Sequence, residues 1–567
     1  NRAHEIDPVE AIFAEVLATV YAKAGDVANA TYFAKLSLAL GLDESTLDAL
    51  PPAFPRFADA YVVISERPLL AAAQRHAARG ETGLAANCLR QQLAFDPHHA
   101  PAQRELAAAA FALGRPWEAA DVLALMQKAG TATAADTSLL ARAHAAMGDT
   151  AIAEVQHLQA TAIAPDDPEV AARRLVDMPL APGATTNSLR EASADWEHRF
   201  ARAAEPASAV TAPQGKRRIG FLCSALADAR DQQLLAEMAL GLTAERYEFF
   251  AYGFGDQETP GNAVLRPSFA NWRNCAELDA DTLAFSIRSD GVEVLFDLGG
   301  FHSPLQLMAL AQRPAPVQVS WLGSAAPLRL GFIDAILADD ATDAAAIAGN
   351  GIAKRLYRLP HGLRAYRRPH GGSDTPVRRG GAVCIGADVG LAQLHPDLCE
   401  AWARLLKAAP QACLLLRNRG FDEEPMVRRL VDRFVPHGVG AQVDVHFGDA
   451  ADYYASLDFA LAPFAAQHPH DEAAMLAHGV PVVGLAGHGR HRRQASGLLT
   501  HAGLSRFVAN SATDYVKFAL ALASSADACA TARSEVLNAV AVSPVFQPSA
   551  LAADFERAIA ELCGGRT

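Results

Sequence analysis

The sequence has no run of 18 uncharged apolar residues, which is the length that a membrane-spanning helix needs. Its eight cysteines are scattered without a CxxC pair, so we expect reduced thiols that pack as small hydrophobic groups. The first ten residues, NRAHEIDPVE, lack the apolar core of a secretory signal, and the net charge of −13 argues against general nucleic-acid binding. These absences predict a cytoplasmic protein with neither a membrane nor a nucleic-acid partner.

A chain of 567 residues is too long for one core, and about three domains are expected.

A 34-residue period is present in the first third of the chain. Three glycines follow helical runs at this spacing, and an alanine stands five residues after each: Gly80 with Ala85, Gly114 with Ala119, and Gly148 with Ala153. Gly25 with Ala30 opens a fourth unit, which a proline-broken insert separates from the others. The period is typical of tetratricopeptide repeats, although an ordinary alanine-rich bundle is the alternative. We predict a repeat domain over 1–175, whose groove holds a protein partner and whose helices could also form a homodimer.

The character of the sequence changes twice after residue 175. Residues 176–214 contain Ala, Pro, Ser and Thr around one short helix near Trp196 and are predicted to be a linker. Strands then alternate with helices over 215–370 and again over 371–545, and a helix over 546–567 closes the chain. The predicted strands lie at 216–224, 247–255, 292–300, 316–323 and 332–340, and then at 382–388, 412–418, 442–448, 459–464 and 481–487. This alternation predicts an α/β fold of two doubly wound, Rossmann-like lobes with a ligand cleft between their strand ends.

The segment RPAPVQVSWLG (313–323) combines two prolines, a short apolar strand and a Trp-Leu-Gly exit. With LFDLGGF (295–301) upstream and a repeat array before two α/β lobes, it closely resembles the O-GlcNAc transferase family. The resemblance implies an α-solenoid of tetratricopeptide repeats followed by a GT-B glycosyltransferase. Its amino-terminal lobe (215–370) would face the acceptor, and its carboxyl-terminal lobe (371–545) would bind the nucleotide-sugar. In that family the proline-strand-Trp segment is framework near the cleft, so we expect Pro316 and Trp321 in the core.

The chain departs from the family pattern where catalysis is expected. The family has an aspartate and a histidine after its first strand, and this chain has Ala225 and Ala229 in their places. A methyl group cannot transfer a proton. Asp228 and Asp231 lie on the same turn and are candidates for the general base, although acidic residues at a helix start are an equally good explanation. His302, in place of a family threonine, is the third candidate.

A second departure concerns the donor. Gln393 stands where the family has a lysine that neutralises the UDP diphosphate. Near the family's phosphate-contacting helix start this chain has His468 and His470, and Ala474 falls at the ribose-binding aspartate. Glu472 is therefore our candidate for gripping the ribose hydroxyls. No third ligand accompanies the two histidines, so we expect neither a metal nor another cofactor.

A basic segment could replace the missing lysine. AGHGRHRRQASGLL (486–499) carries Arg490, Arg492 and Arg493 after a glycine-rich entry. Backbone amides at such a turn and clustered guanidinium groups bind anions, although a solvated basic face is the alternative. A UDP-sugar brings two phosphates, whereas a CMP-nonulosonate brings one phosphate and one carboxylate. The altered set of cations fits the second donor about as well as the first.

We therefore expect a protein O-glycosyltransferase that moves a sugar from a nucleotide-sugar to Ser or Thr of an acceptor held by the repeats. The layout is similar to that of some bacterial flagellin-modifying transferases, so a CMP-nonulosonate such as pseudaminic acid is the favoured donor and flagellin the favoured acceptor. Two alternatives stay open. One is a protein O-GlcNAc transferase that uses UDP-GlcNAc, and the other is a catalytically degenerate repeat scaffold.

Overall fold

The computed structural model describes most of the chain after residue 67. It covers 68–564 apart from 182, 202–214, 224–228, 243–244, 254–264, 270, 324–329, 344–354, 369–382, 419–422 and 465–468, together with residues 17, 18, 21 and 33. The chain forms two compact units, one of residues 1–147 with 158–163 and the other of 148–157 with 164–567. The predicted repeat around Gly25 lies outside the described residues.

The first unit is helical, as the period predicts. Its helices are α5 (Pro68–Ala78), α6 (Thr82–Phe95), α7 (Ala100–Ala112), α8 (Pro116–Ala129) and α9 (Ala134–Ala146), followed by part of α10 (Thr150–Ile163). Gly80 and Gly114 turn the chain between paired helices with φ of 75° and 77°, a left-handed conformation that favours glycine. Ala85 and Ala119, five residues further on, are buried where the helices approach each other. The small residues therefore occur where the helix packing needs them.

Two helices precede the sheets of the second unit: α11 (Pro168–Asp177) and α12 (Thr186–Phe200). Helix α12 is the one expected near Trp196, but it is part of the packed unit. The Trp196 side chain is buried, its indole N–H donates to the Pro168 carbonyl at 2.9 Å, and its ring lies 5.2 Å from that of Phe301. Much of the predicted linker thus packs against the amino-terminal lobe.

The amino-terminal lobe is a seven-stranded parallel sheet in the order β3-β2-β1-β4-β5-β6-β7. The strands are β1 (Arg217–Leu222), β2 (Tyr247–Gly253), β3 (Asn271–Asn274), β4 (Val294–Asp297), β5 (Val317–Ser320), β6 (Ala335–Ala338) and β7 (Arg355–Arg358). Its helices are α13 (Ala229–Gly241), α14 (Ala280–Ser289) and α15 (Pro304–Ala311). The strand order reverses between β1 and β4, and ligands of open α/β sheets bind at the carboxyl ends of such strands.

The carboxyl-terminal lobe has a six-stranded sheet in the order β10-β9-β8-β11-β12-β13. The strands are β8 (Cys384–Asp388), β9 (Cys413–Arg417), β10 (Val443–Val445), β11 (Phe459–Leu461), β12 (Val482–Leu485) and β13 (Val508–Ala509). The helices are α16 (Pro396–Ala408), α17 (Glu424–Asp432), α18 (Ala450–Ser456), α19 (His470–Ala477), α20 (Gln494–His501), α21 (Ala512–Ala523) and α22 (Ala526–Val542). This sheet reverses between β8 and β11, so each lobe has one switch point.

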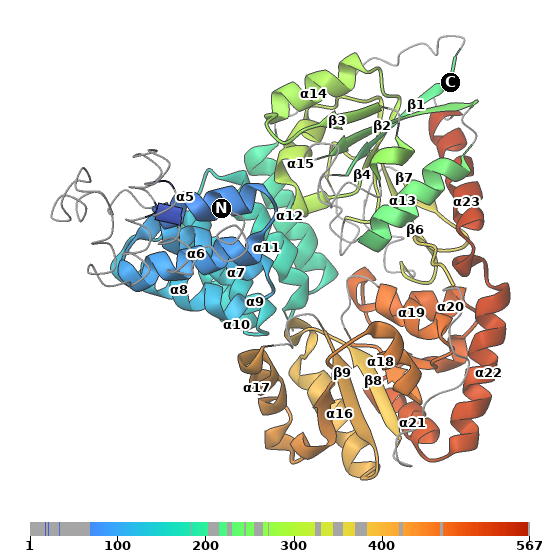
Figure 1. Cartoon of the computed structure of the whole chain (residues 1–567). Helices are drawn as coiled ribbons and strands as arrows, with labels where there is room; N and C mark the ends of the chain where they lie inside the picture. The colour runs from blue at the N-terminus through green and yellow to red at the C-terminus, as the bar shows by residue number, and fades with distance from the viewer. Residues whose placement is uncertain are drawn as a thin grey trace. The chain divides into compact units, whose positions relative to one another are not determined.

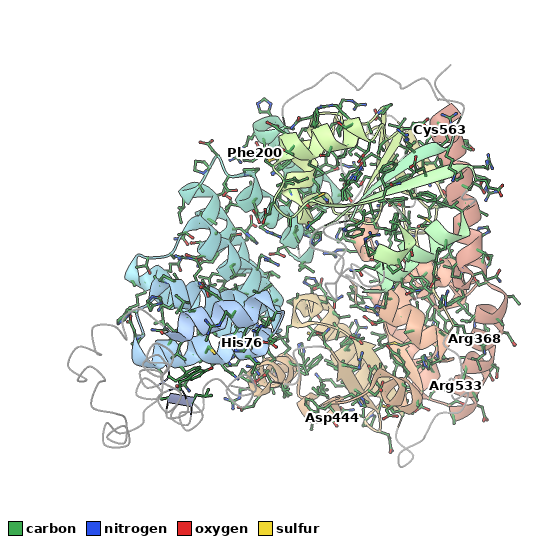
Figure 2. All side chains as sticks on the ribbon, turned by 45° about the horizontal axis from the view of Figure 1, so that its top comes forward. His76, Phe200, Arg368, Asp444, Arg533 and Cys563 are labelled. Carbon is green, nitrogen blue, oxygen red and sulfur yellow. The ribbon has the colours of Figure 1, made fainter. Side chains whose placement is uncertain are left out.

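The last helix, α23 (Pro548–Gly564), returns to the amino-terminal lobe (Figure 1). Phe555 lies in the core of that lobe, with its ring 4.7 Å from Phe296 and 5.1 Å from Trp321. Cys563, labelled in Figure 2, packs against the same core near the end of the helix. The chain therefore crosses between the lobes twice, which ties them together.

Two expectations from composition can be compared with the structure. All eight cysteines are free thiols. Among the described residues, no helix has both the length and the apolar character needed to cross a bilayer.

The RPAPVQVSWLG segment is framework, as predicted. Pro316 and Trp321 are buried, and the Trp321 indole N–H donates to the Leu363 carbonyl at 3.1 Å. The Trp-Leu-Gly exit has a steric cause. A Cβ at Gly323 would lie 2.5 Å from the carbonyl oxygen of Leu298 and 2.5 Å from the carbonyl carbon of Gly299. The loops after β4 and β5 thus touch backbone to backbone at the switch point, and only glycine fits.

We expect Gly323→Ala to lower the free energy of unfolding by about 1–3 kcal/mol, because the added methyl group meets rigid backbone. Urea denaturation of the full chain measures the change. Gly183→Ala is the matched control, because a Cβ there meets nothing within 4 Å. Equal stability of the two variants would contradict the steric explanation.

Candidate functional site

The carboxyl ends of the two sheets meet along a seam, by which we mean the contacts between residues 215–368 and 383–545. The loop after β6 supplies Asp339 and Asp343 from the amino-terminal side. The start of α19 and the loop after β12 supply His470 and Arg490 from the other side. Loops at the carboxyl ends of both sheets therefore bring polar side chains to the same seam, and this is the edge where open α/β sheets bind ligands.

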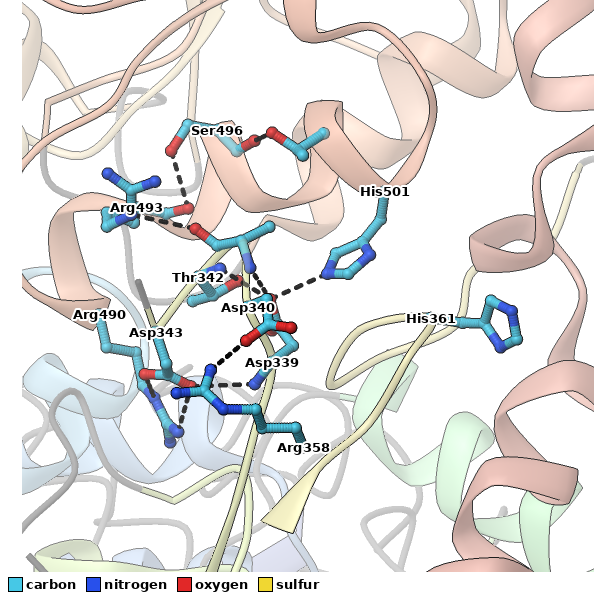
Figure 3. Close-up of polar contacts among 12 residues, drawn as sticks. Asp339, Asp340, Thr342, Asp343, Arg358, His361, Arg490, Arg493, Ser496 and His501 are labelled. Atoms are coloured by element: carbon cyan, nitrogen blue, oxygen red, sulfur yellow. Dashed lines mark hydrogen bonds and ion pairs between the residues drawn. The ribbon is translucent and has the colours of Figure 1, made fainter. Parts of the chain in front are cut away.

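A buried ion pair closes one part of the seam (Figure 3). The Arg490 guanidinium donates to both carboxylate oxygens of Asp343, at 2.7 and 2.6 Å, and to the Leu337 carbonyl at 2.9 Å. Both side chains are almost fully buried. Arg493 donates to the carbonyls of Ala341 at 3.0 Å and Gly487 at 3.3 Å. In the structure the Arg490 guanidinium therefore binds the other lobe, and its role toward a phosphate stays a prediction.

His501, at the end of α20, adds a third contact to this part of the seam. Its Nε2 lies 2.9 Å from a carboxylate oxygen of Asp339. Burial alone raises the pKa of the Asp339 carboxyl, but hydrogen bonds from His501 and Thr342 outweigh it and hold the pKa below its ordinary value. Asp339 is therefore a structural anion at neutral pH.

Asp231 forms a second bridge across the seam. Its carboxylate lies 2.9 Å from Arg364 Nε and 3.0 Å from His470 Nε2, and all three side chains are buried. Burial raises the pKa of Asp231, but the charges of Arg364 and His470 lower it far below its ordinary value. A carboxylate held this way is a weak base, which does not favour the prediction that Asp231 takes the acceptor proton. Next to it, Arg230 pairs with Asp471 at 2.5 Å.

Glu472, in the first turn of α19, is a further buried carboxyl group of the site. Burial and the nearby charges of Asp471 and Asp388 raise its pKa to about 8. Asp388, at the end of β8, pairs with Arg417 at 2.8 Å, yet burial and Asp471 raise its pKa to about 7. At neutral pH the Glu472 carboxyl is mostly protonated, so it can donate one hydrogen bond and accept others. That capacity suits a sugar diol.

Three of the remaining candidates lie among the described residues. Gln393 accepts a hydrogen bond from the Gly390 amide at 2.9 Å. His302 is exposed after β4, and Arg492 is half-buried and lines a cavity of about 660 Å³. Asp228 and His468 lie outside the described residues. In the part of the chain that the structure describes, no three His, Cys, Asp or Glu side chains are grouped as a metal site would need.

Sequence reasoning missed the partners of the predicted residues. Asp339, Asp343 and Arg364 come from the amino-terminal lobe or the segment after it and have no motif of their own. Only the fold brings them to Arg490, His501 and Asp231. The acidic run ADD at 338–340, at the end of a predicted strand, was the available signal.

Part of the chain is similar to known proteins. Residues 200–363 match the glycosyl transferase family 41. The protein named "Probable UDP-N-acetylglucosamine--peptide N-acetylglucosaminyltransferase SPINDLY" from Oryza sativa subsp. japonica is 29% identical over 283 residues, which are 48% of this chain and 30% of that protein. Its Arabidopsis thaliana namesake is 28% identical over 296 residues, which are 51% and 32% of the two chains. This chain thus spans about a third of the length of these relatives.

A solved structure, a mutant of the Thermobaculum terrenum O-GlcNAc transferase, matches with a TM-score of 0.79 at 23% identity and covers 90% of this chain and 98% of that one. Two facing Rossmann-like lobes after a helical region are the GT-B glycosyltransferase architecture, and the family 41 match lies in the first of them. The protein is a relative of the O-GlcNAc transferases, and the resemblance drawn from RPAPVQVSWLG is confirmed.

Proposed function

We propose that the protein is an O-glycosyltransferase that transfers a sugar from a nucleotide-sugar to a Ser or Thr hydroxyl of a protein acceptor. The observation that carries the proposal is the seam, where both switch points of a GT-B fold present buried polar groups. The relatives whose names state a peptide N-acetylglucosaminyltransferase activity support the same reaction class.

In the proposed reaction the acceptor oxygen attacks the anomeric carbon of the donor sugar. The new carbon–oxygen bond forms as the bond to the phosphate breaks, and the nucleotide leaves with the electron pair. His302, exposed after β4, and Asp228 are the proposed acceptors of the hydroxyl proton. Glu472 is the proposed contact to the ribose, because a buried neutral carboxyl donates to one hydroxyl while accepting from its neighbour.

The donor that we propose is a CMP-nonulosonate, with flagellin as the acceptor, and UDP-GlcNAc is the competing donor. Gln393 has no charge to offer a diphosphate. Arg490 pairs with Asp343, whereas Arg492 lines a cavity of about 660 Å³. Arg492 is therefore the arginine that we propose as the contact to a phosphate or a carboxylate of the donor. The names of the plant relatives favour UDP-GlcNAc, which makes the choice of donor a question for experiment.

The test is nucleotide release and acceptor mass with the full chain, flagellin and each donor in turn. We expect release of CMP with an increase in flagellin mass equal to one nonulosonate. Release of UDP with a hexosamine increment would overturn the donor proposal and keep the transferase. No release with either donor would overturn the transferase in favour of the repeat scaffold.

A further inference from the structure

Two buried histidines in the carboxyl-terminal lobe have ring nitrogens without hydrogen-bond partners. Both nitrogens of His491, which is 1% exposed, and Nε2 of His395 have no hydrogen-bond partner among the residues that the structure describes. A buried polar atom without a partner costs free energy of folding. The fold keeps three such atoms in one neighbourhood, which indicates that a ligand or ordered water supplies the missing partner.

The surroundings of the two rings are positively charged. Burial, with the charges of Arg492 and His395 beside it, lowers the pKa of His491 to about 4. Burial, with Arg492 and Arg433, also lowers the pKa of His395, whereas Asp397 acts in the opposite direction. Both rings are therefore neutral at pH 7 and offer N–H donors next to arginine charge. Such a group is suited to an oxygen anion and poorly suited to a cation.

Residues that follow the two histidines in the chain line an open space, which the histidine rings themselves do not line. Arg492, the residue after His491, and Asp397, two residues after His395, both line the cavity of about 660 Å³. Thr186, from the start of α12, lines the cavity too, and its hydroxyl lies beside Gly489, which packs on the His491 ring. The cavity is at the carboxyl ends of β11, β12 and β13, which is the edge where α/β sheets bind ligands.

We propose that His395, His491 and Arg492 form an oxyanion subsite that binds the phosphate or the sugar carboxylate of the donor. The inference rests on the proposed function for the identity of the ligand, but its observations are independent of that function. The subsite supplies a positive charge for the anion at the edge of the sheet, where the Gln393 side chain is uncharged. Its two neutral imidazoles donate hydrogen bonds, and Arg492 supplies the charge.

Calorimetry on the full chain tests the subsite with three probes: inorganic phosphate, CMP and CMP-N-acetylneuraminate. We expect His491→Leu to weaken binding about 10-fold or more, the effect of losing one hydrogen bond to a charged group. Equal losses for CMP and CMP-N-acetylneuraminate assign the subsite to the phosphate. A loss for CMP-N-acetylneuraminate alone assigns it to the carboxylate. His198→Leu, an exposed histidine on α12, is the matched control.

Thermal unfolding without ligand separates a binding role from a structural one. Because His491 has no partner, His491→Leu should be at least as stable as the parent chain. A loss of stability would overturn the proposal, as would affinities within two-fold of the parent for every probe or no binding by the parent chain. If the parent chain transfers sugar but the His491→Leu variant binds every probe normally, the subsite proposal is overturned and the transferase proposal is kept. If the parent chain transfers no sugar but phosphate or CMP binds through His491, the transferase proposal is overturned and the subsite proposal is kept.

Discussion

Replacing Arg490 by leucine is expected to lower the free energy of unfolding by about 3–5 kcal/mol, because it leaves the Asp343 carboxylate buried without its partner. Urea denaturation of the full chain measures the loss. The double variant Arg490→Leu with Asp343→Leu should recover much of it, since replacing both partners removes the unpaired charge. This result would identify the arginine as a clamp between the lobes.

The control is a surface ion pair in the same region. Arg358 pairs with Asp340, which is close to Asp343 in the chain, and the Asp340 side chain is 82% exposed (Figure 3). Arg358→Leu should therefore lower the free energy of unfolding by at most about 1 kcal/mol. If Arg490→Leu instead left stability unchanged and abolished nucleotide binding, Arg490 would be a donor ligand, as its sequence context suggested. Similar losses in both single variants would also contradict the clamp.

The repeat phase and the positions of ten strands along the chain were predictable from the sequence, because each depends on a local pattern. Helical turns need glycine at a left-handed position, so Gly80 and Gly114 mark the repeats directly. Buried parallel strands need apolar runs, and ten such runs became strands. The strands that were missed are at or next to sheet edges and lack the pattern: β3 reads NWRN, β7 reads RLYR, and β13 has only two residues.

The site was predictable only as a neighbourhood. The sequence indicated that His470, Glu472 and the arginines gather near strand ends, and the fold brings His470 and Arg490 to the seam. It could not indicate which guanidinium finds a carboxylate, because Asp343 is about 150 residues from Arg490 in the chain. The glycine-rich entry and the clustering of the three arginines suggested anion binding for all of them. Burial and pairing distinguish them, leaving Arg492 at the cavity and Arg490 in the clamp.

Among the groups discussed, Glu472 is expected to have the largest effect on how the free energy of unfolding changes with pH. Its pKa is about 8 in the folded protein, whereas the ordinary value for a glutamate is 4.5. Below pH 4.5 the carboxyl is neutral in both the folded and the unfolded chain, so it does not lower the free energy of unfolding. As the pH rises from about 4.5 to 8, the unfolded chain ionises while the folded chain holds the proton, so stability falls. Glu472→Gln removes this loss. We expect the variant to match the parent chain near pH 4.5 and to exceed it by up to about 4 kcal/mol at pH 8.

Denaturation of both chains between pH 5 and 8 measures the difference, and Glu472→Ala checks its cause. Alanine leaves a cavity, so its curve should be offset to lower stability, but it should show the same pH slope relative to the parent because the carboxyl is absent from both variants. Asp388 is present in all three chains and contributes to the common background. A difference that stays flat with pH would mean that Glu472 ionises normally in the fold. A neutral carboxyl at the proposed ribose contact would then be excluded, and the hydroxyls would meet a carboxylate that only accepts.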